Sequence, residues 1–87
     1  MTQNSELVRR EMRAFIEENF LYLQPDLKLS DEQDLLAHGV VDSLGFVELV
    51  EEVQGRFGIT VEDVEVTEEN FGSIDAIVAF VHRKRAG

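Results

Sequence analysis

The sequence predicts an all-α protein, a small bundle in which three amphipathic helices pack on one another. In three segments, apolar residues recur at three- and four-residue steps, which is the spacing of one helix face. No segment shows the alternation of apolar and polar residues that is typical of a strand. Because an amphipathic helix must bury its apolar stripe against a partner, three such helices favour a bundle. The 87 residues are enough for one domain, which is expected to span residues 1–87.

The first predicted helix precedes Pro25. Its apolar residues share one face, and they are Val8, Met12, Phe15, Ile16 and Phe20. Asn4 or Ser5 is expected to cap its start, because a short polar side chain can accept a hydrogen bond from a free backbone N–H there. The helix is expected to end before Pro25, since proline disfavours helical angles in the residue that precedes it.

A long connection is predicted at residues 21–41. It is not polar and is therefore expected to lie on the core; among its branched apolar residues are Leu23, Leu27, Leu29, Leu35, Leu36, Val40 and Val41. Residues 34–39 are interpreted as a single helical turn that Gly39 ends. The acidic residues at 31–34 lack the spacing of a calcium-binding loop, so we expect them to carry loop charge and to cap this turn.

The second helix is expected to begin at Asp42-Ser43 and to end near Phe57, with Gly58 as its stop. On a helical wheel the predicted core face holds Phe46, Val47, Leu49, Val50, Val53 and Phe57. The predicted solvent face holds Leu44, Glu48, Glu51, Glu52, Gly55 and Arg56. Leu44 is then the one large apolar residue on the solvent face, beside a row of acids, which suits docking to a basic partner surface.

The last third of the chain predicts a short turn and a final helix. Residues 59–66 form a short connection in which Asp63 and Glu65 have no predicted partner. Residues 67–71 are expected to make a short capped turn that Gly72 closes, and Ser73 caps the final helix. The buried stripe of that helix is Ile74, Ile77, Val78 and Val81, and its last turn carries Arg83, Lys84 and Arg85.

Acidic charge is concentrated in the middle of the chain. The net charge is −10, from 18 acidic and 8 basic residues. Residues 31–75 hold thirteen of the acids and one base, Arg56. This balance disfavours nucleic acid and anionic membranes as partners and favours proteins with positive patches. The absence of cysteine, of a targeting segment and of a long apolar run leads us to expect a cytoplasmic protein.

Ser43 has three interpretations. It could cap the second helix, or act as a nucleophile, or receive a covalent group at an exposed helix start. Residues 41–45 match only the last three positions of the G-x-S-x-G elbow of serine hydrolases, and no strand is predicted before them. Neither histidine, His38 or His82, is in a setting that indicates a catalytic base. His38 and His82 lack further ligands at metal spacing, so no metal site is predicted.

Residues 39–49, Gly-Val-Val-Asp-Ser-Leu-Gly-Phe-Val-Glu-Leu, resemble the phosphopantetheine attachment motif of acyl and peptidyl carrier proteins. In that family the serine opens the second helix and receives a 4′-phosphopantetheine arm from coenzyme A. The order of segments over residues 6–83 follows the family as well. The resemblance implies a small four-helix bundle of acyl carrier protein type, with three longer helices, a short third helix near residues 67–71 and a long first loop.

Carried over to this sequence, the resemblance makes Ser43 the attachment residue and Asp42 and Leu44 its motif neighbours. The implied partner face is Leu44, Glu48, Glu51 and Glu52. The implied protein is a non-catalytic monomer that holds its cargo as a thioester. Its implied partners are a phosphopantetheinyl transferase, an adenylating or acyl-loading enzyme, and downstream transferases, synthases or tailoring enzymes.

The cargo is left open between two classes. Carriers of fatty acid synthesis usually have an acid two places after the serine and acids at the end of the second helix, where this chain has Gly45 and Gln54-Gly55-Arg56. The motif looks more like free-standing carriers served by adenylating enzymes, including aminoacyl and D-alanyl carrier proteins. The favoured cargo is therefore an aminoacyl group or another adenylated acid. The alternatives are an acyl chain of fatty acid or polyketide type, and an acidic helical interaction module without a cofactor.

Overall fold

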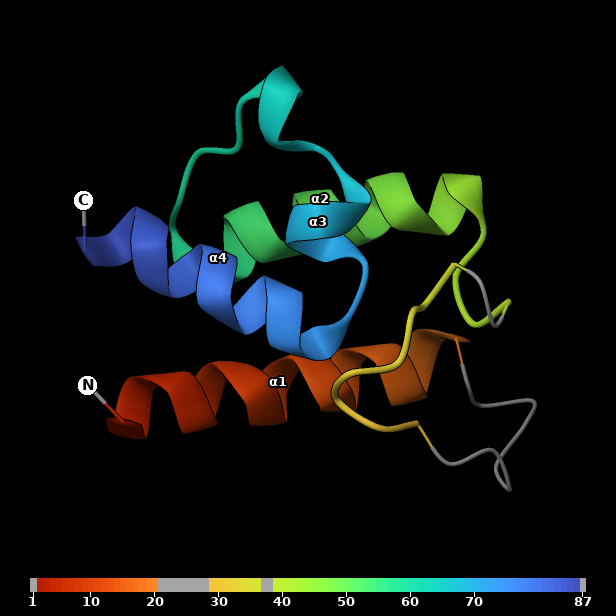
Figure 1. Ribbon diagram of the computed structural model, residues 1–87, viewed down its shortest axis with the longest axis horizontal. Helices are drawn as coiled ribbons and strands as arrows, with labels where there is room; N and C mark the ends of the chain where they lie inside the picture. The colour runs from red at the N-terminus through yellow and green to blue at the C-terminus, as the bar shows by residue number, and fades with distance from the viewer. Residues whose placement is uncertain (1, 21–28, 37–38, 87) are drawn as a thin grey trace.

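The computed structural model describes residues 2–20, 29–36 and 39–86. It contains α1 (Thr2–Phe20), α2 (Ser43–Phe57), α3 (Glu68–Phe71) and α4 (Ile74–Ala86), with a short 3₁₀ helix, η1 (Asp63–Glu65), before α3 (Figure 1). The described residues form no strand. The predicted all-α class and the bundle with a short third helix are confirmed.

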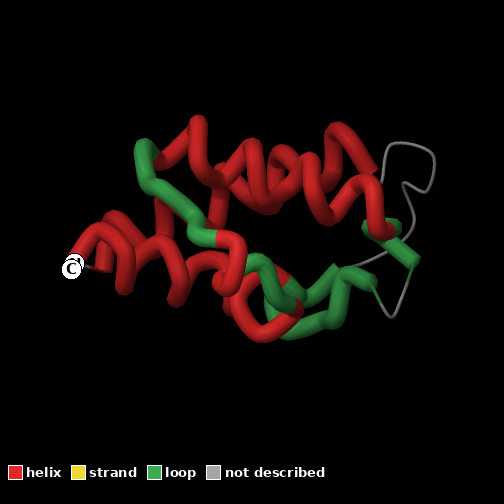
Figure 2. Tube along the Cα trace, turned by 90° about the horizontal axis from the view of Figure 1, so that it is seen from above, coloured by secondary structure: helices red, strands yellow, loops and turns green. Residues whose placement is uncertain are grey.

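The helices form a bundle in which α2 and α4 run in the opposite direction to α1 (Figures 1 and 2). The last helix, α4, packs on α1 and α3, and α3 packs on α2. The single turn of α3 therefore links the second helix to the fourth. None of the helices in the described part of the chain is long and apolar enough to cross a membrane.

The core is apolar throughout, and every predicted stripe contributes to it. Its buried members are Val8, Met12, Ile16, Leu29, Leu35, Val40, Val41, Leu49, Val50, Val53, Phe57, Phe71, Ile74, Ile77, Val78, Phe80 and Val81. Phe71 is the one buried residue of α3, and its ring packs against Phe46 at 6.3 Å and Phe80 at 5.0 Å between centroids. These contacts explain how four residues can join α2 to α4.

The described part of the long connection lies on the core, as its apolar residues predict. Leu35 is fully buried, and its backbone N–H donates to the carbonyl of Gly72 at 2.7 Å. Its own carbonyl accepts from Val41 at 3.1 Å. The segment is thereby held against the junction of α3 and α4, and it leads directly into α2. Leu23 and Leu27 lie outside the described residues.

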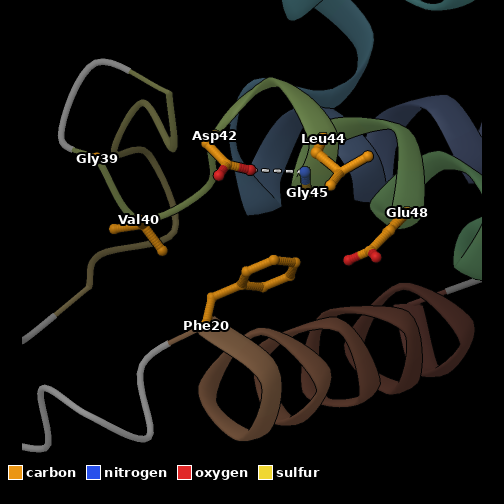
Figure 3. Close-up of a pocket in the computed structure, with 7 residues that line it drawn as sticks. All are labelled: Phe20, Gly39, Val40, Asp42, Leu44, Gly45 and Glu48. Carbon is orange, nitrogen blue, oxygen red and sulfur yellow. Dashed lines mark hydrogen bonds between the residues drawn. The ribbon is translucent and has the colours of Figure 1, made fainter.

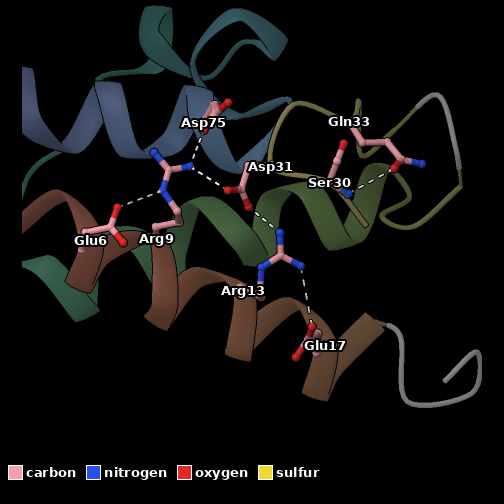
Figure 4. Close-up of polar contacts among 8 residues, drawn as sticks. All are labelled: Glu6, Arg9, Arg13, Glu17, Ser30, Asp31, Gln33 and Asp75. Atoms are coloured by element: carbon pink, nitrogen blue, oxygen red, sulfur yellow. Dashed lines mark hydrogen bonds and ion pairs between the residues drawn. The ribbon is translucent and has the colours of Figure 1, made fainter. Parts of the chain in front are cut away.

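Asp31 joins this connection to two helices (Figure 4). Its carboxylate pairs with Arg9 at 3.0 Å and also with Arg13, both on α1, and Arg9 pairs in addition with Asp75 on α4. The Asp31 carbonyl accepts from the Asp75 N–H at 2.9 Å. Partial burial raises the pKa of Asp31, but the hydrogen bonds and charges of Arg13 and Arg9 outweigh it, so its pKa lies below the ordinary value.

The predicted C-terminal end of α2 and the predicted start of α4 are confirmed. Gly58 ends α2 with a φ of 65°, a left-handed conformation that glycine adopts without strain. Ser73 caps α4, since its hydroxyl accepts from the N–H of Ala76 at 3.1 Å. The start of α1 differs from the prediction, because the helix begins at Thr2 and therefore includes Asn4 and Ser5.

Three further features differ from what the sequence suggested, and Ala37 and His38 of the predicted turn lie outside the described residues. Val47 is not in the core, because its side chain is 50% exposed. The described part of residues 34–39 forms non-helical turns, although Gly39 does have a positive φ, 71°. Glu65 has a partner, since its carboxylate pairs with Lys84 at 3.0 Å and so fastens η1 to α4.

Candidate functional site

Ser43 is the first residue of α2 and is exposed. Val41, two residues before Ser43, is buried at 1% exposure. The chain therefore leaves the core and turns outward between Val41 and Ser43. The Ser43 hydroxyl makes no hydrogen bond to any described residue. An exposed hydroxyl at a helix start, with no hydrogen bond to a described residue, is accessible to a modifying enzyme.

Asp42, not Ser43, caps the helix. Its backbone is extended, and its carboxylate Oδ1 accepts from the N–H of Gly45 at 2.7 Å. The first N–H groups of a helix have no intrahelical partner, and those of Ser43 and Leu44 make no hydrogen bond among the described residues. Asp42 therefore accepts from one N–H group, that of Gly45, and leaves the N–H groups of Ser43 and Leu44 without a partner among the described residues.

Phe20, the last residue of α1, packs against the first turn of α2 at Gly45. A Cβ at Gly45 would lie 2.8 Å from the Cε1 atom of Phe20 and 3.1 Å from Oδ1 of Asp42. No side chain fits there without displacing the ring. This close approach gives the physical reason why the position two residues after Ser43 holds glycine, and it was not predicted from the sequence.

A pocket of about 280 Å³ lies between the end of α1 and the start of α2 (Figure 3). Phe20 and Val40 provide apolar wall, Leu44 stands at its edge, and Asp42 and Glu48 provide carboxylates. Asp42 and Leu44, the chain neighbours of Ser43, line this pocket, whereas Ser43 itself does not.

The outward face of α2 carries two exposed apolar residues and two exposed acids. Leu44 is 71% exposed and Val47 is 50% exposed. Glu48 and Glu51 lie on the same face at helical spacing and are exposed. The helical wheel placed Val47 in the core. Its position three residues after Leu44 and four before Glu51 puts it on the same helix face as those two predicted surface residues.

Glu52 differs from the other acids of the predicted partner face. It is only partly exposed, and its carboxylate accepts from Nε of Arg56 at 2.8 Å. The same guanidinium reaches Glu11 on α1 at 3.2 Å. The hydrogen bond from Arg56 to Glu52 is the main reason why the pKa of Arg56 lies above its ordinary value, despite partial burial.

The described residues do not assemble an active site of their own around Ser43. No strand precedes the serine in the described ranges, and His82 is exposed on α4, whose Arg85 contacts Phe57 at the other end of α2 from Ser43. His38 lies outside the described residues. Within the same ranges no three histidine, aspartate or glutamate side chains gather to hold a metal ion.

The residues at this helix start fit a phosphodiester on a serine. Two N–H groups that have no hydrogen-bond partner among the described residues and the positive end of the α2 dipole favour an anion, and the first turn of α2 itself contains no acidic residue. The negative charge of Asp42 opposes a phosphate, but its carboxylate is turned to the N–H of Gly45.

Comparison with known proteins identifies the family. The family model described as a phosphopantetheine attachment site matches residues 18–81. A D-alanyl carrier protein of Streptococcus suis is 39% identical over 61 residues, which are 70% of this chain and 76% of that protein. A D-alanyl carrier protein of another strain of that species is 35% identical over 74 residues, which are 85% of this chain and 90% of that protein. The chain therefore belongs to the phosphopantetheine-binding family of carrier proteins, whose covalent cofactor is 4′-phosphopantetheine.

Proposed function

We propose that Ser43 carries the 4′-phosphopantetheine arm and that the protein delivers an aminoacyl group, held as a thioester, to biosynthetic enzymes. The observation that carries this proposal is the exposed Ser43 hydroxyl at the start of α2, which bonds to no described residue and lies beside the cap made by Asp42. The family match includes this position.

Attachment of the arm requires only that the chain present Ser43 to a transferase. The serine oxygen attacks the pyrophosphate of coenzyme A, a phosphodiester forms, an adenosine bisphosphate leaves, and the hydroxyl proton passes to the transferase. The free N–H groups of Ser43 and Leu44 stabilise the resulting negative charge. When bound, the arm supplies a thiol that holds an acyl group as a thioester.

The outward face of α2 is the proposed docking surface. Leu44 and Val47 offer apolar contact, and Glu48 and Glu51 attract basic partner residues. Charge of this kind raises the rate of encounter more than the final affinity, so partners can exchange quickly. The tether raises the effective concentration of the cargo at each partner in turn. The carrier then needs no catalytic group of its own.

An aminoacyl cargo is supported by the relatives and by the charge of α2. Both relatives are named as D-alanyl carrier proteins. Two positions at which carriers of fatty acid synthesis usually have acids hold Gly45 and Arg56. The proposed loading partner is therefore an enzyme that adenylates an amino acid or a related carboxylic acid, followed by a transferase that removes the cargo.

Loading assays test this proposal. The purified protein is first incubated with coenzyme A and a broad-specificity phosphopantetheinyl transferase, and its intact mass is measured. The product is then offered to a panel of adenylating enzymes with ATP and either amino acids or fatty acids. We expect one phosphopantetheinyl group per chain and a thioester with an amino acid. A carrier that accepts only fatty acyl groups would contradict the cargo, and a chain without an adduct would contradict the carrier role.

A further inference from the structure

Arg56 pairs with Glu52, the partly exposed acid of the predicted partner face of α2. We propose that Arg56 is a specificity-determining residue, which neutralises Glu52 and confines the acidic docking surface to Glu48 and Glu51. This inference rests on the proposed docking role of α2. It assigns to Arg56 a selection among partners, which the carrier function alone does not require.

The contact between Arg56 and Glu52 is close and follows the helix. The two residues lie one turn apart, and Nε of Arg56 donates to Oε2 of Glu52 at 2.8 Å. A terminal guanidinium nitrogen contacts the same oxygen. The side chains are 33% and 31% exposed, so the pair is partly shielded from water. Two nitrogens on one carboxylate oxygen hold the charges closer than a typical surface pair.

Contacts with α1 keep the guanidinium in this position. Another nitrogen of Arg56 donates to Glu11 at 3.2 Å. The guanidinium carbon also lies 5.8 Å from the centre of the Phe15 ring, within the range of a cation–π contact. Three partners on two helices restrict the arginine, so it is not free to leave Glu52 and meet an incoming protein.

The consequence for a partner is electrostatic. Glu48 and Glu51 are exposed and form no ion pair with any described residue, so each presents a full negative charge. A cationic side chain that approaches Glu52 meets a positive charge next to the negative one, and the two potentials largely cancel. The attractive surface therefore ends about two turns after Ser43.

The partners that fit this surface place their basic residues against the first turns of α2 and apolar residues against Leu44 and Val47. Enzymes whose basic residues must reach the last turns of α2 lose the attraction that an unpaired Glu52 would provide, because Arg56 already pairs with it. The chain thus selects partners by the position of its unpaired acids.

Charge-neutralising substitutions test the inference with a phosphopantetheinyl transferase that has a basic carrier-binding surface. The readout is kcat/KM for transfer of the arm at low ionic strength, and circular dichroism checks the fold of each variant. With Arg56 present, Glu48→Gln is expected to lower kcat/KM by roughly threefold or more, and Glu52→Gln by less than about twofold. In an Arg56→Gln background, Glu52→Gln is expected to cost as much as Glu48→Gln.

The outcomes separate this inference from the carrier function. Equal effects of Glu48→Gln and Glu52→Gln with Arg56 present, whether large or negligible, overturn the role of Arg56 while the carrier function stands. A Glu52→Gln effect that does not grow when Arg56 is replaced overturns it as well. A wild-type chain that takes no phosphopantetheine overturns the carrier function and this inference together.

Discussion

The Asp42 carboxylate accepts a hydrogen bond from the N–H of Gly45 at 2.7 Å, so the cap of α2 lies one residue before Ser43. The residue that stabilises the helix start is therefore not the residue proposed to carry the arm. Asp42 holds the first turn in place, and Ser43 stays free on its surface. Stability and modification can then be changed separately.

Substitutions at these two positions should affect stability differently. Asp42→Ala removes the cap and is expected to lower the free energy of unfolding by about 0.5–2 kcal/mol. Ser43→Ala removes a hydroxyl that bonds to none of the residues in the described ranges and is expected to change the free energy of unfolding by less than about 0.5 kcal/mol. Urea denaturation of both variants measures this difference. A greater loss for Ser43→Ala than for Asp42→Ala would mean that the serine is the cap.

Substitution of alanine for each of the two glycines of α2 should change stability in opposite directions. Gly55 has open space around it, so Gly55→Ala is expected to stabilise the protein by about 0.5–1 kcal/mol. Gly45→Ala forces the ring of Phe20 to move and is expected to lose that gain, with a net cost of up to about 2 kcal/mol. Thermal unfolding gives both values. If Phe20→Ala does not relieve the cost of Gly45→Ala, the close approach at Gly45 is not its cause.

Leu44 should contribute to docking more than to the fold. Its side chain is 71% exposed, so Leu44→Ala is expected to change stability by less than about 0.5 kcal/mol. The same substitution, and Glu48→Lys on the same face, should raise KM in arm transfer by roughly threefold or more. Steady-state kinetics with each variant as substrate test this. A large loss of thermal stability would show instead that Leu44 supports the core.

Asp31 should make stability depend on pH in the acid range. Its folded-state pKa lies below its ordinary value, so the stabilisation from its ionised form is complete above the ordinary pKa and is lost as pH falls through the folded-state pKa. Asp31→Asn is expected to cost roughly 0.5–1 kcal/mol at neutral pH and nothing at strongly acidic pH. Urea denaturation across pH, with exposed Glu32→Gln as control, measures it. A cost of Asp31→Asn that persists unchanged in acid would contradict the ion-pair explanation.

Local features of the fold were predictable because their signals lie within a few residues. Gly58 ends α2 and Ser73 caps the start of α4, as glycine and serine commonly do at these positions. The cap of α2 was ambiguous because Asp42 and Ser43 are both good capping residues, and only the backbone geometry separates them. Val47 was assigned to the core because the stripe of α2 is broad, and its exposure depends on where neighbouring helices end.

Contacts between distant residues were not predictable from spacing. The contact of Phe20 with Gly45 and the ion pair of Arg56 with Glu11 both depend on how α1 approaches α2. The sequence by itself showed only that positions 45 and 56 hold a glycine and an arginine. The structure supplies physical reasons: a ring fills the space at Gly45, and Arg56 binds carboxylates on two helices.

Attachment of the arm to Ser43 is measured by the intact mass of three chains after incubation with coenzyme A and a broad-specificity phosphopantetheinyl transferase. The chains are the wild type, Ser43→Ala and Ser73→Ala, where Ser73 is a second serine at a helix start. We predict one phosphopantetheinyl group on the wild type and on Ser73→Ala, and none on a folded Ser43→Ala. An adduct on Ser43→Ala, or no adduct on the wild type, would contradict the claim.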